Sequence, residues 1–493
     1  MHSVAAFVIA GLVAGSSLGA APLVNAAPTA AVTSIQWTPC KPDSPEWAVW
    51  KGAECASLRL PVDWARPDGP TFDLKIARRT ATGPGTRVGT LVFGPGGPGD
   101  SGVERVGTGI TRFSAEVRRR FDIVSFDPRG VGGSSPVTCP PEKLTARPSP
   151  EMTSQADFDA TVRYNRELRD DCRQQTTNGI FDHLDSAQAI QDLEALRVAL
   201  GEGKLTFHGS SYGTMLGAQY AETYPRHVRA MVLESVMDHS VPRTRTFLEN
   251  EAAAAQDLFD EFVKWCGPNP TCALHDRDVR AVWKELLARA ESGRLATPPD
   301  LVRRLGPTVS SIDLVNAIAF QRFYRGDFAG LAKEIDAMDR SAPVNGPAPR
   351  LSPLPPTTSI FCSDWRLPVR DYRGYASLVR RMNAAAPDMP YLLPLRMVAA
   401  CLGAPTANPQ HLLDPAAHQA PPVLLSNALH DPATPHRWAA SVARQFGSKG
   451  VLLTYDGWGH GSATSGPCME NTVDRYLTDL VVPPRGTHCP AVR

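Results

Sequence analysis

The segment Gly209-Ser210-Ser211-Tyr212-Gly213 constrains the fold of this chain more than any other part of its sequence. It fits the pattern G-x-S-x-G and stands between an apolar run, Lys204–Phe207, and a helix-compatible run, Thr214–Ala221. In this setting the glycines permit a strained turn from strand to helix, which lifts the Ser211 hydroxyl above the edge of a sheet. The same letters also occur by chance where a glycine-rich turn closes a strand. The flanking strand and helix favour a nucleophilic serine over such a plain turn.

Further apolar runs alternate with helical patterns along the chain. Runs typical of buried or half-buried strands occupy residues 56–62, 72–77, 89–93, 123–126, 204–207, 230–233, 422–425 and 450–455. Residues 186–200 carry apolar or small side chains at helical spacing. Strands that alternate with helices predict a mostly parallel sheet with helices on both faces, an α/β fold.

Residues 238–420 break this alternation. They show helical patterning at 249–265 and 277–291, and they are rich in proline at 343–356, a candidate loop or hinge. A chain of 493 residues is long enough for one sheet core and an insertion. We therefore predict a core formed by residues 27–237 and 421–493, with residues 238–420 inserted as a mainly helical cap.

A catalytic serine needs a base and an acid that orients the base. His460 follows the last predicted strand and has a glycine on either side, which suits a loop histidine that reaches the serine. Asp431 follows the preceding strand, and in α/β-hydrolases the order along the chain is Ser, then Asp or Glu, then His. Glu234 and Asp238, after an earlier strand, are rival acids. His430 is not chosen as the base, because adjacent side chains diverge in direction. The plain alternatives are a surface-loop histidine and a turn aspartate before a proline.

The glycine-rich segment Gly94–Gly99 directly follows the strand predicted at 89–93. Backbone in such a loop approaches a substrate closely, because no side chains intervene. We expect one oxyanion-hole donor from the N–H of Gly97 and the other from the N–H of Tyr212, next to the serine. A phosphate cradle is the alternative, but the loop fits neither GxxxxGK[ST] nor GxGxxG.

The N-terminus is predicted to be a signal peptide, residues 1–26. Residues 4–24 are almost all apolar or small, and Val24-Asn25-Ala26 offers a small-residue cleavage site. The stretch departs from a typical signal because Met1-His2-Ser3 carries no Lys or Arg. Serines, glycines and Pro22 disfavour a membrane anchor. No later segment has 18 uninterrupted apolar residues, so we expect a secreted mature protein without a membrane span.

Ten cysteines agree with export, because disulfides form in oxidising compartments. They are Cys40, Cys55, Cys139, Cys172, Cys266, Cys272, Cys362, Cys401, Cys468 and Cys489. Pairing of neighbours along the chain would close five short or medium loops, but the sequence alone does not fix the connectivity. No pair has CxxC spacing and none lies near a pair of histidines, so we expect no metal site.

The charge of the chain gives no bias toward polyanions. It has 51 Lys and Arg against 50 Asp and Glu, a net charge of +1. Nucleic acid and anionic membrane surfaces are therefore not expected partners. Hydrophobic residues make up 42% of the chain, which is enough for a sizeable core and is not typical of a disordered protein.

Five motifs together resemble the secreted tripeptidyl aminopeptidases of actinobacteria, in the prolyl-aminopeptidase-like branch of the α/β-hydrolases. They are Gly94–Gly99, Asp127–Gly130, Gly209–Thr214, Asp431–Pro435 and Gly459–Gly461, and the similarity extends over nearly the whole chain after the signal. The resemblance implies Ser211, Asp431 and His460 as the triad and no metal or organic cofactor. It also implies release of short peptides, often tripeptides, from the free N-termini of peptides or proteins. One departure is Glu234-Ser235-Val236, where the family pattern is closer to Asp-Gly-Val.

An exopeptidase must also bind the ammonium group of its substrate, and a carboxylate is the expected partner. Glu234, at the base of the cap, is a tentative choice for this substrate-binding role. The other candidates on the cap are Glu249, Glu251, Asp257, Asp260, Glu261 and Asp364, and spacing does not choose among them.

Two other functions fit part of the sequence. A secreted carboxylesterase or lipase would use the same triad, because the fold and the triad fix acyl transfer but not the acyl group. A catalytically silent binding protein on the same fold is disfavoured, because all three triad residue types are present.

Overall fold

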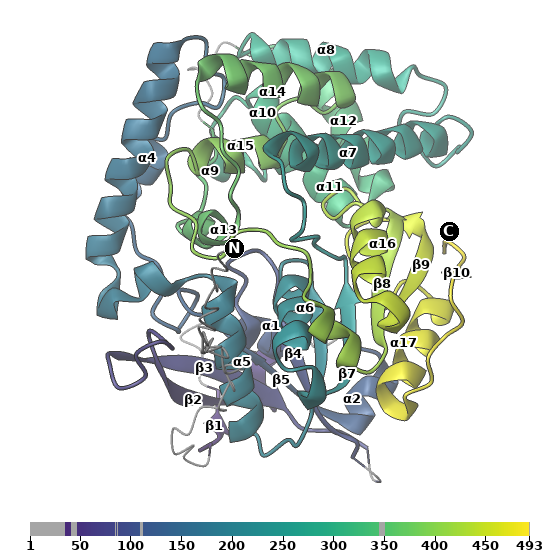
Figure 1. Cartoon of the computed structure of the whole chain (residues 1–493). Helices are drawn as coiled ribbons and strands as arrows, with labels where there is room; N and C mark the ends of the chain where they lie inside the picture. The colour runs from purple at the N-terminus through teal and green to yellow at the C-terminus, as the bar shows by residue number, and fades with distance from the viewer. Residues whose placement is uncertain are drawn as a thin grey trace, which may run out of the picture.

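The strands of this protein form one mixed sheet beneath a helical layer (Figure 1). A computed structural model describes residues 35–40, 47–83, 85, 87–108, 112–344 and 351–492, so the predicted signal peptide, residues 1–26, lies outside the described residues. The strands are β1 (Thr38–Pro39), β2 (Glu54–Pro61), β3 (Thr71–Arg79), β4 (Gly89–Gly94), β5 (Phe121–Phe126), β6 (Leu205–Ser210), β7 (Val228–Glu234), β8 (Val423–His430), β9 (Gly450–Trp458) and β10 (Thr487–Cys489).

The helices outside the interval between β7 and β8 are α1 (Gly102–Thr108), α2 (Ala115–Arg120), α3 (Pro141–Thr145), α4 (Gln155–Gln175), α5 (Ser186–Ala199), α6 (Gly213–Thr223), α16 (His436–Gln445) and α17 (Pro467–Asp479). Those inside it are α7 (Thr244–Cys266), α8 (Val279–Glu291), α9 (Val302–Leu305), α10 (Ser311–Asp313), α11 (Phe320–Tyr324), α12 (Phe328–Arg340), α13 (Thr358–Asp364), α14 (Tyr372–Ala385) and α15 (Leu393–Ala400). In the described part of the chain, no helix combines the length and the apolar character that a membrane span requires.

The strand order of the sheet is β1-β2-β3-β5-β4-β6-β7-β8-β9-β10. The pairs from β1 to β5 are antiparallel, whereas the pairs from β5 through β4 to β10 are parallel. Every residue of β4 and of β6 is buried, as expected for central strands that are covered on both faces. Gly94 at the end of β4 pairs with Gly209 of β6, so the glycine-rich loop and the serine turn emerge at the same edge of the sheet.

Helices cover both faces of this sheet, as the sequence predicts. Helices α1, α2 and α17 share one hydrophobic cluster with the sheet, and α5, α6 and α16 share the other. The neighbouring residues Met231 and Val232 of β7 belong to opposite clusters, because successive side chains of a strand point to opposite faces. The predicted α/β fold, a mostly parallel sheet with helices on both faces and an accompanying helical region, is therefore confirmed.

The helices between β7 and β8 fill the interval in which the sequence predicts an inserted cap, and they lie above the sheet in Figure 1. Helix α4, which precedes that interval in sequence, lies along the same helical layer. Its Asn165 Nδ2 donates to the Ala399 carbonyl at 2.9 Å, and the Tyr375 hydroxyl donates to the Pro150 carbonyl at 2.7 Å. The helical layer therefore extends beyond residues 238–420 and includes α4, which belongs to the predicted core segment 27–237.

The ten cysteines pair with their neighbours along the chain. The disulfides are Cys40–Cys55, Cys139–Cys172, Cys266–Cys272, Cys362–Cys401 and Cys468–Cys489. This is the neighbour pairing that the sequence suggests without fixing it. Each bond therefore closes a local loop, and none joins distant parts of the chain.

Candidate active site

Ser211 occupies the turn between β6 and α6. Its φ is 55°, in the left-handed region that non-glycine residues rarely adopt, and its N–H donates to the Glu234 carbonyl at 2.9 Å. The glycines around it are required sterically. A Cβ at Gly209 would lie 2.5 Å from the Gly213 carbonyl oxygen, and one at Gly213 would lie 2.3 Å from the Gly94 carbonyl oxygen. The predicted strand–turn–helix geometry around the serine is thus present.

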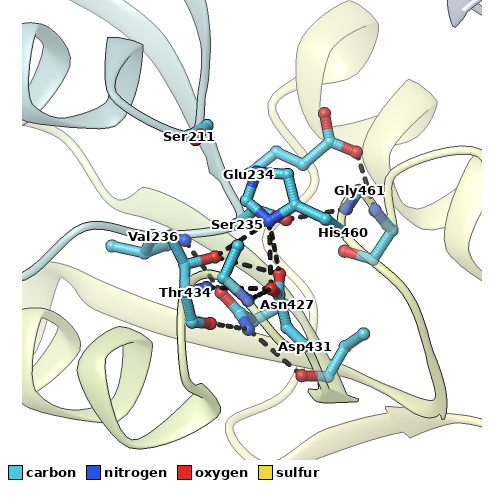
Figure 2. Close-up of polar contacts among 12 residues, drawn as sticks. Ser211, Glu234, Ser235, Val236, Asn427, Asp431, Thr434, His460 and Gly461 are labelled. Carbon is cyan, nitrogen blue, oxygen red and sulfur yellow. Dashed lines mark hydrogen bonds and ion pairs between the residues drawn. The ribbon is translucent and has the colours of Figure 1, made fainter. Parts of the chain in front are cut away.

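Asp431 and His460 meet at the ends of neighbouring strands, β8 and β9. Nδ1 of His460 lies 3.0 and 3.1 Å from the two Asp431 carboxylate oxygens (Figure 2). Asp431 also accepts hydrogen bonds from the N–H groups of Ala433 and Thr434 and from the Thr434 hydroxyl, each at 2.9 Å. The side chains of His460 and Asp431 are 3% and 0% exposed. Burial and these hydrogen bonds fix the carboxylate, so that it holds the Nδ1 edge of the imidazole.

The other ring nitrogen of His460, Nε2, makes no hydrogen bond to Ser211 in this structure. Within the described residues, Nε2 of His460 is buried and has no hydrogen-bond partner. Tyr324 of the helical layer holds His460 in two ways. The centroids of the two rings lie 4.3 Å apart, and the backbone carbonyl of Tyr324 accepts the backbone N–H of His460 at 2.8 Å. Because Nδ1 faces Asp431, Nε2 is the atom left to exchange a proton with a nucleophile or a leaving group.

The glycine-rich loop after β4 approaches the serine. A Cβ at Gly96 would lie 3.0 Å from the Ser211 Cβ and 3.6 Å from its Oγ. Gly97 has a φ of 107°, and its peptide bond to Pro98 is cis. Tyr212 stands at the start of α6, directly after the serine. The structure thus brings the loop that carries Gly97 and the residue Tyr212 to the same place.

Glu234 is buried at the end of β7, and both its carboxylate oxygens have protein partners. Oε1 accepts the N–H groups of Ser462 and Ala463 at 2.8 and 2.7 Å, and Oε2 contacts His208 at 3.1 Å and Arg112 at 3.3 Å. Burial raises the pKa of Glu234, but the hydrogen bond and charge of His208 and the charge of Arg112 outweigh burial and hold this pKa well below its usual range. Both oxygens of Glu234 are thus engaged by protein groups, and its tentative role in binding substrate stays a prediction.

The rival residues lie elsewhere. Glu234 pairs with His208 rather than with His460, and Asp238 caps its own turn by accepting the Ser240 N–H at 2.9 Å. Nδ1 of His430 lies 2.7 Å from a carboxylate oxygen of Asp257 on α7. Neither rival acid therefore contacts the base, and His430 pairs with α7.

Arg129, in the segment Asp127–Gly130, ties loops of the core together. It forms a fully buried ion pair with Asp192 at 2.6 Å and donates to the carbonyls of Val62 and His183 at 2.7 and 2.9 Å. Among the described residues, no group of three or more His, Cys, Asp or Glu side chains is arranged to hold a metal ion.

Comparison with known proteins agrees with this geometry. The profile of the family described as "alpha/beta hydrolase fold" matches residues 89–467. The chain belongs to the α/β-hydrolase family. This α/β-hydrolase is 30% identical to serine protease Hip1 of Mycobacterium tuberculosis, over 92% of its own length and 91% of the length of Hip1.

Two further relatives cover most of the same α/β-hydrolase chain. The tripeptidyl aminopeptidase of Streptomyces lividans is 29% identical over 92% of this chain and 86% of its own. Carboxylesterase B of M. tuberculosis is 29% identical over 97% of this chain and 96% of its own. These relatives support the assignment of the protein as a serine hydrolase.

The carboxylates of the cap differ in their partners. Five are paired within the described structure: Glu249 with Arg245, Asp257 with His430, Asp260 with Arg280, Glu261 with Lys264, and Asp364 with Tyr212 and Ser186. Glu251 on α7 is 6% exposed, and no hydrogen bond or ion pair among the described residues involves it. Burial, and then the charge of Asp431, raise the pKa of Glu251 well above its usual value.

Sequence reasoning missed several contacts of this α/β-hydrolase. Thr434, which donates to Asp431, lies three residues after it in the motif Asp431–Pro435, so its position in the sequence already indicates that it is close to Asp431. Tyr324 and the bond between Tyr212 and Asp364 carry no such signal, because each joins segments more than 100 residues apart.

Proposed function

We propose that this α/β-hydrolase is a secreted serine exopeptidase that releases short peptides, such as tripeptides, from the free N-termini of peptides and proteins. The observation that carries the exopeptidase assignment is Glu251 of α7, a buried carboxylate with no hydrogen-bond or ion-pair partner among the described residues. The similarity to a serine protease and to a tripeptidyl aminopeptidase supports peptide substrates. Five disulfides and the predicted signal peptide support secretion.

In the proposed reaction, Ser211 is the nucleophile and His460 the base. Nε2 of His460 takes the hydroxyl proton as Ser211 Oγ attacks the scissile carbonyl, and Asp431 stabilises the imidazolium that forms. The N–H groups of Gly97 and Tyr212 donate to the oxyanion of the tetrahedral intermediate. His460 then protonates the leaving amine, and the C–N bond breaks to give the acyl-enzyme.

Water completes the cycle. His460, neutral again, takes a proton from water as it attacks the ester carbon of the acyl-enzyme. The same two N–H groups of Gly97 and Tyr212 bind the second oxyanion. Return of the proton to Ser211 Oγ releases the peptide acid and restores the enzyme.

The position of Glu251 supports a requirement for a free amine. Phe247, one helical turn before it, stacks on Trp438 of α16, and Asp257 bonds to His430 at the end of β8. Glu251 therefore lies on the part of α7 that faces the strand ends, within the electrostatic influence of Asp431. An ammonium ion there would form a charge-assisted hydrogen bond with a carboxylate that otherwise has none.

The raised pKa of Glu251 gives this interaction a pH dependence. A protonated carboxyl group has no charge with which to hold an ammonium ion, and substrate binding favours its ionisation. As the pH falls, the neutral form of Glu251 becomes harder to ionise, so KM for free-amine peptides should rise.

The direct test compares three substrates on the mature protein. These are an Ala-Ala-Pro p-nitroanilide with a free amine, the same peptide with an acetylated amine, and a short p-nitrophenyl ester. We expect cleavage of the free-amine peptide and little cleavage of the acetylated one. Ser211→Ala should lose cleavage of both peptides. Cleavage of the ester alone would refute the exopeptidase assignment.

The variant Glu251→Gln tests the amine subsite. Loss of one charged hydrogen bond should lower kcat/KM for the free-amine peptide about 10- to 100-fold, chiefly through KM, and leave the ester rate nearly unchanged. Glu249→Gln is the matched control, two residues away on the same helix and already paired with Arg245. Equal losses in the two variants, or equal losses on peptide and ester, would exclude Glu251 as the amine anchor.

A carboxylesterase is the second candidate function. The similarity to carboxylesterase B over 97% of this chain favours it. The same triad would act on an ester, and Glu251 would then have no substrate partner. Turnover of the ester with no turnover of either peptide would select this function.

A further inference from the structure

Asp364, the last residue of α13, connects the cap to the serine turn. It is 0% exposed, and its Oδ2 accepts a hydrogen bond from the hydroxyl of Tyr212, the residue that follows the proposed nucleophile. Its Oδ1 accepts the N–H and the hydroxyl of Ser186, both at 2.8 Å, at the start of α5. One carboxylate of the cap therefore bonds to two separate elements of the core.

The backbone of Asp364 is held from the other side. Its carbonyl lies 2.7 Å from Nε2 of His239, and Nδ1 of that ring lies 3.0 Å from Nε2 of Gln219 on α6. Burial lowers the pKa of His239 to about 4, so the ring is neutral at pH 7. The Gln219 amide then donates to Nδ1, and the ring N–H at Nε2 donates to Asp364. The disulfide Cys362–Cys401 secures α13 to the end of α15.

Helix α13 reaches both proposed oxyanion donors. Thr357, directly before the helix, lies against the glycine-rich loop: a Cβ at Gly99 would meet its Oγ1 at 2.3 Å. At the other end of the helix, Asp364 bonds to Tyr212. Ile360 and Asp364 of α13 and Gly96, Gly99 and Tyr212 of the core also line one small pocket. One short helix thus contacts the loop that carries Gly97 and the residue that would supply the second N–H.

An apolar contact would join the cap to the core at a lower desolvation cost. Burial raises the pKa of Asp364 to about 7, although hydrogen bonds from Ser186 and Tyr212 lower it, and Asp185 adds a like charge nearby. A buried carboxylate is costly, whereas a hydrogen bond fixes direction better than apolar packing does. The cost of burying this carboxyl group therefore indicates that the hydrogen bond orients the Tyr212 side chain and does not only attach the cap to the core.

We propose that Asp364 is a positioning residue: by holding the Tyr212 side chain, it fixes the direction of the Tyr212 N–H toward the oxyanion and makes this alignment depend on the seating of the cap. The inference rests on the proposed function, in which Ser211 is the nucleophile and the Tyr212 N–H stabilises the tetrahedral intermediate. Asp364 does not touch substrate. It acts through Tyr212, so its removal should change kcat and leave substrate binding intact.

The test uses Asp364→Asn, Tyr212→Phe and the double variant in the full mature chain. Rates are measured on the p-nitrophenyl ester and on the free-amine peptide, per active site titrated with a fluorophosphonate, well below each melting temperature. We expect kcat to fall about 10- to 100-fold on both substrates, with KM within about twofold, because misdirection of one oxyanion donor acts only in the transition state. The double variant should lose no more than the worse single variant, because both substitutions act on the same bond: Tyr212→Phe removes its hydroxyl donor, and Asp364→Asn replaces its carboxylate acceptor with a neutral amide.

The control is Asp474→Asn on α17. Asp474 is also a buried carboxyl with a hydroxyl partner, Ser114, at 2.8 Å, and burial raises its pKa to about 6. It belongs to the helix on the opposite face of the sheet, so its variant should keep kcat within about twofold. Tyr212→Phe preserves ring volume and keeps the test valid if Asp364→Asn fails to fold.

Separate outcomes distinguish the two levels of the proposal. Unchanged kcat in Tyr212→Phe, a loss confined to KM, or additive losses in the double variant would overturn the positioning role while Ser211 chemistry stands. Failure of the wild-type protein to react with the fluorophosphonate at Ser211 would overturn the proposed function, and the positioning role with it.

Discussion

At the residue scale, two neighbouring residues at the end of β7, Glu234 and Ser235, hold the loop that follows His460. Glu234 accepts the N–H groups of Ser462 and Ala463, and the Ser235 hydroxyl accepts the N–H of Gly461 at 2.8 Å. A glycine in place of Ser235 would leave the Gly461 N–H without this acceptor. Three consecutive N–H groups after His460 are therefore fixed by side chains at the end of β7. Ser235 has a φ of 57°, a strained conformation that these bonds offset.

The pH dependence of stability at Glu234 follows from its lowered pKa. Because its folded pKa lies below its unfolded value near 4.5, the ionised carboxylate contributes stability above about pH 4.5, and this contribution is lost as the pH falls toward the folded pKa. Glu234→Gln should therefore lower the free energy of unfolding by about 2 kcal/mol at pH 7 and by much less near pH 2, where the folded carboxylate also approaches protonation. Urea unfolding at the two pH values measures this difference.

Glu116→Gln is the surface control for that experiment. Glu116 pairs with Arg119 and Arg120 in partly exposed bonds, so its variant should change the free energy of unfolding by no more than about 0.5 kcal/mol. An equal destabilisation by Glu234→Gln at pH 7 and near pH 2 would contradict the assignment of its stabilising role to the ionised form.

At the element scale, the site depends on the close approach of α6 to the loop after β4. Gly213, the first residue of α6, has space for no side chain, because a Cβ would lie 2.3 Å from the Gly94 carbonyl oxygen and 2.7 Å from that of Pro95. Backbone atoms on both sides cannot move away without separating the two proposed oxyanion donors. The packing of these elements, and not only the turn itself, therefore places the catalytic groups.

The variant Gly213→Ala tests this packing. We expect fluorophosphonate labelling of Ser211 and ester turnover to fall about 100-fold, with a lower melting temperature, because both N–H donors are displaced. Gly203→Ala is the control, since Gly203 has no atom within 4 Å of a Cβ and no positive φ. Retention of full labelling by Gly213→Ala would show that the two elements tolerate separation.

Elements with a strong local signal are predicted from the sequence, and elements fixed by distant partners are not. The apolar run at 230–233 and the helical pattern at 186–200 match β7 and α5. Helix α4 has a largely polar sequence, and its few buried residues include Phe158 and Leu168. Its packing partners come from α14 and α15, more than 200 residues later, so local patterning does not reveal it. Likewise, nothing in the sequence separates the unpaired Glu251 from the paired carboxylates around it.

At the scale of the whole molecule, local disulfides stabilise a cap and core that are built from separated segments. Cys139–Cys172 joins the segment after β5 to α4, a helix of the helical layer. Cys266–Cys272 only closes the turn after α7. Since none of the five disulfides bridges distant segments, association of the cap with the core depends on packing and on hydrogen bonds such as that of Asn165 with Ala399.

Removal of these two disulfides should therefore have unequal effects. In the chain-entropy model, a loop of 33 residues predicts a loss of about 4 kcal/mol for Cys139→Ser/Cys172→Ser, and a loop of 6 residues predicts about 2 kcal/mol for Cys266→Ser/Cys272→Ser. Urea unfolding followed by circular dichroism measures both. The ester rate at low temperature is the control, because neither disulfide contacts the residues of the serine turn or the histidine loop, and it should stay near the wild-type value in both variants. The reverse order of stabilities would mean that the turn after α7 limits unfolding and that the docking of α4 does not.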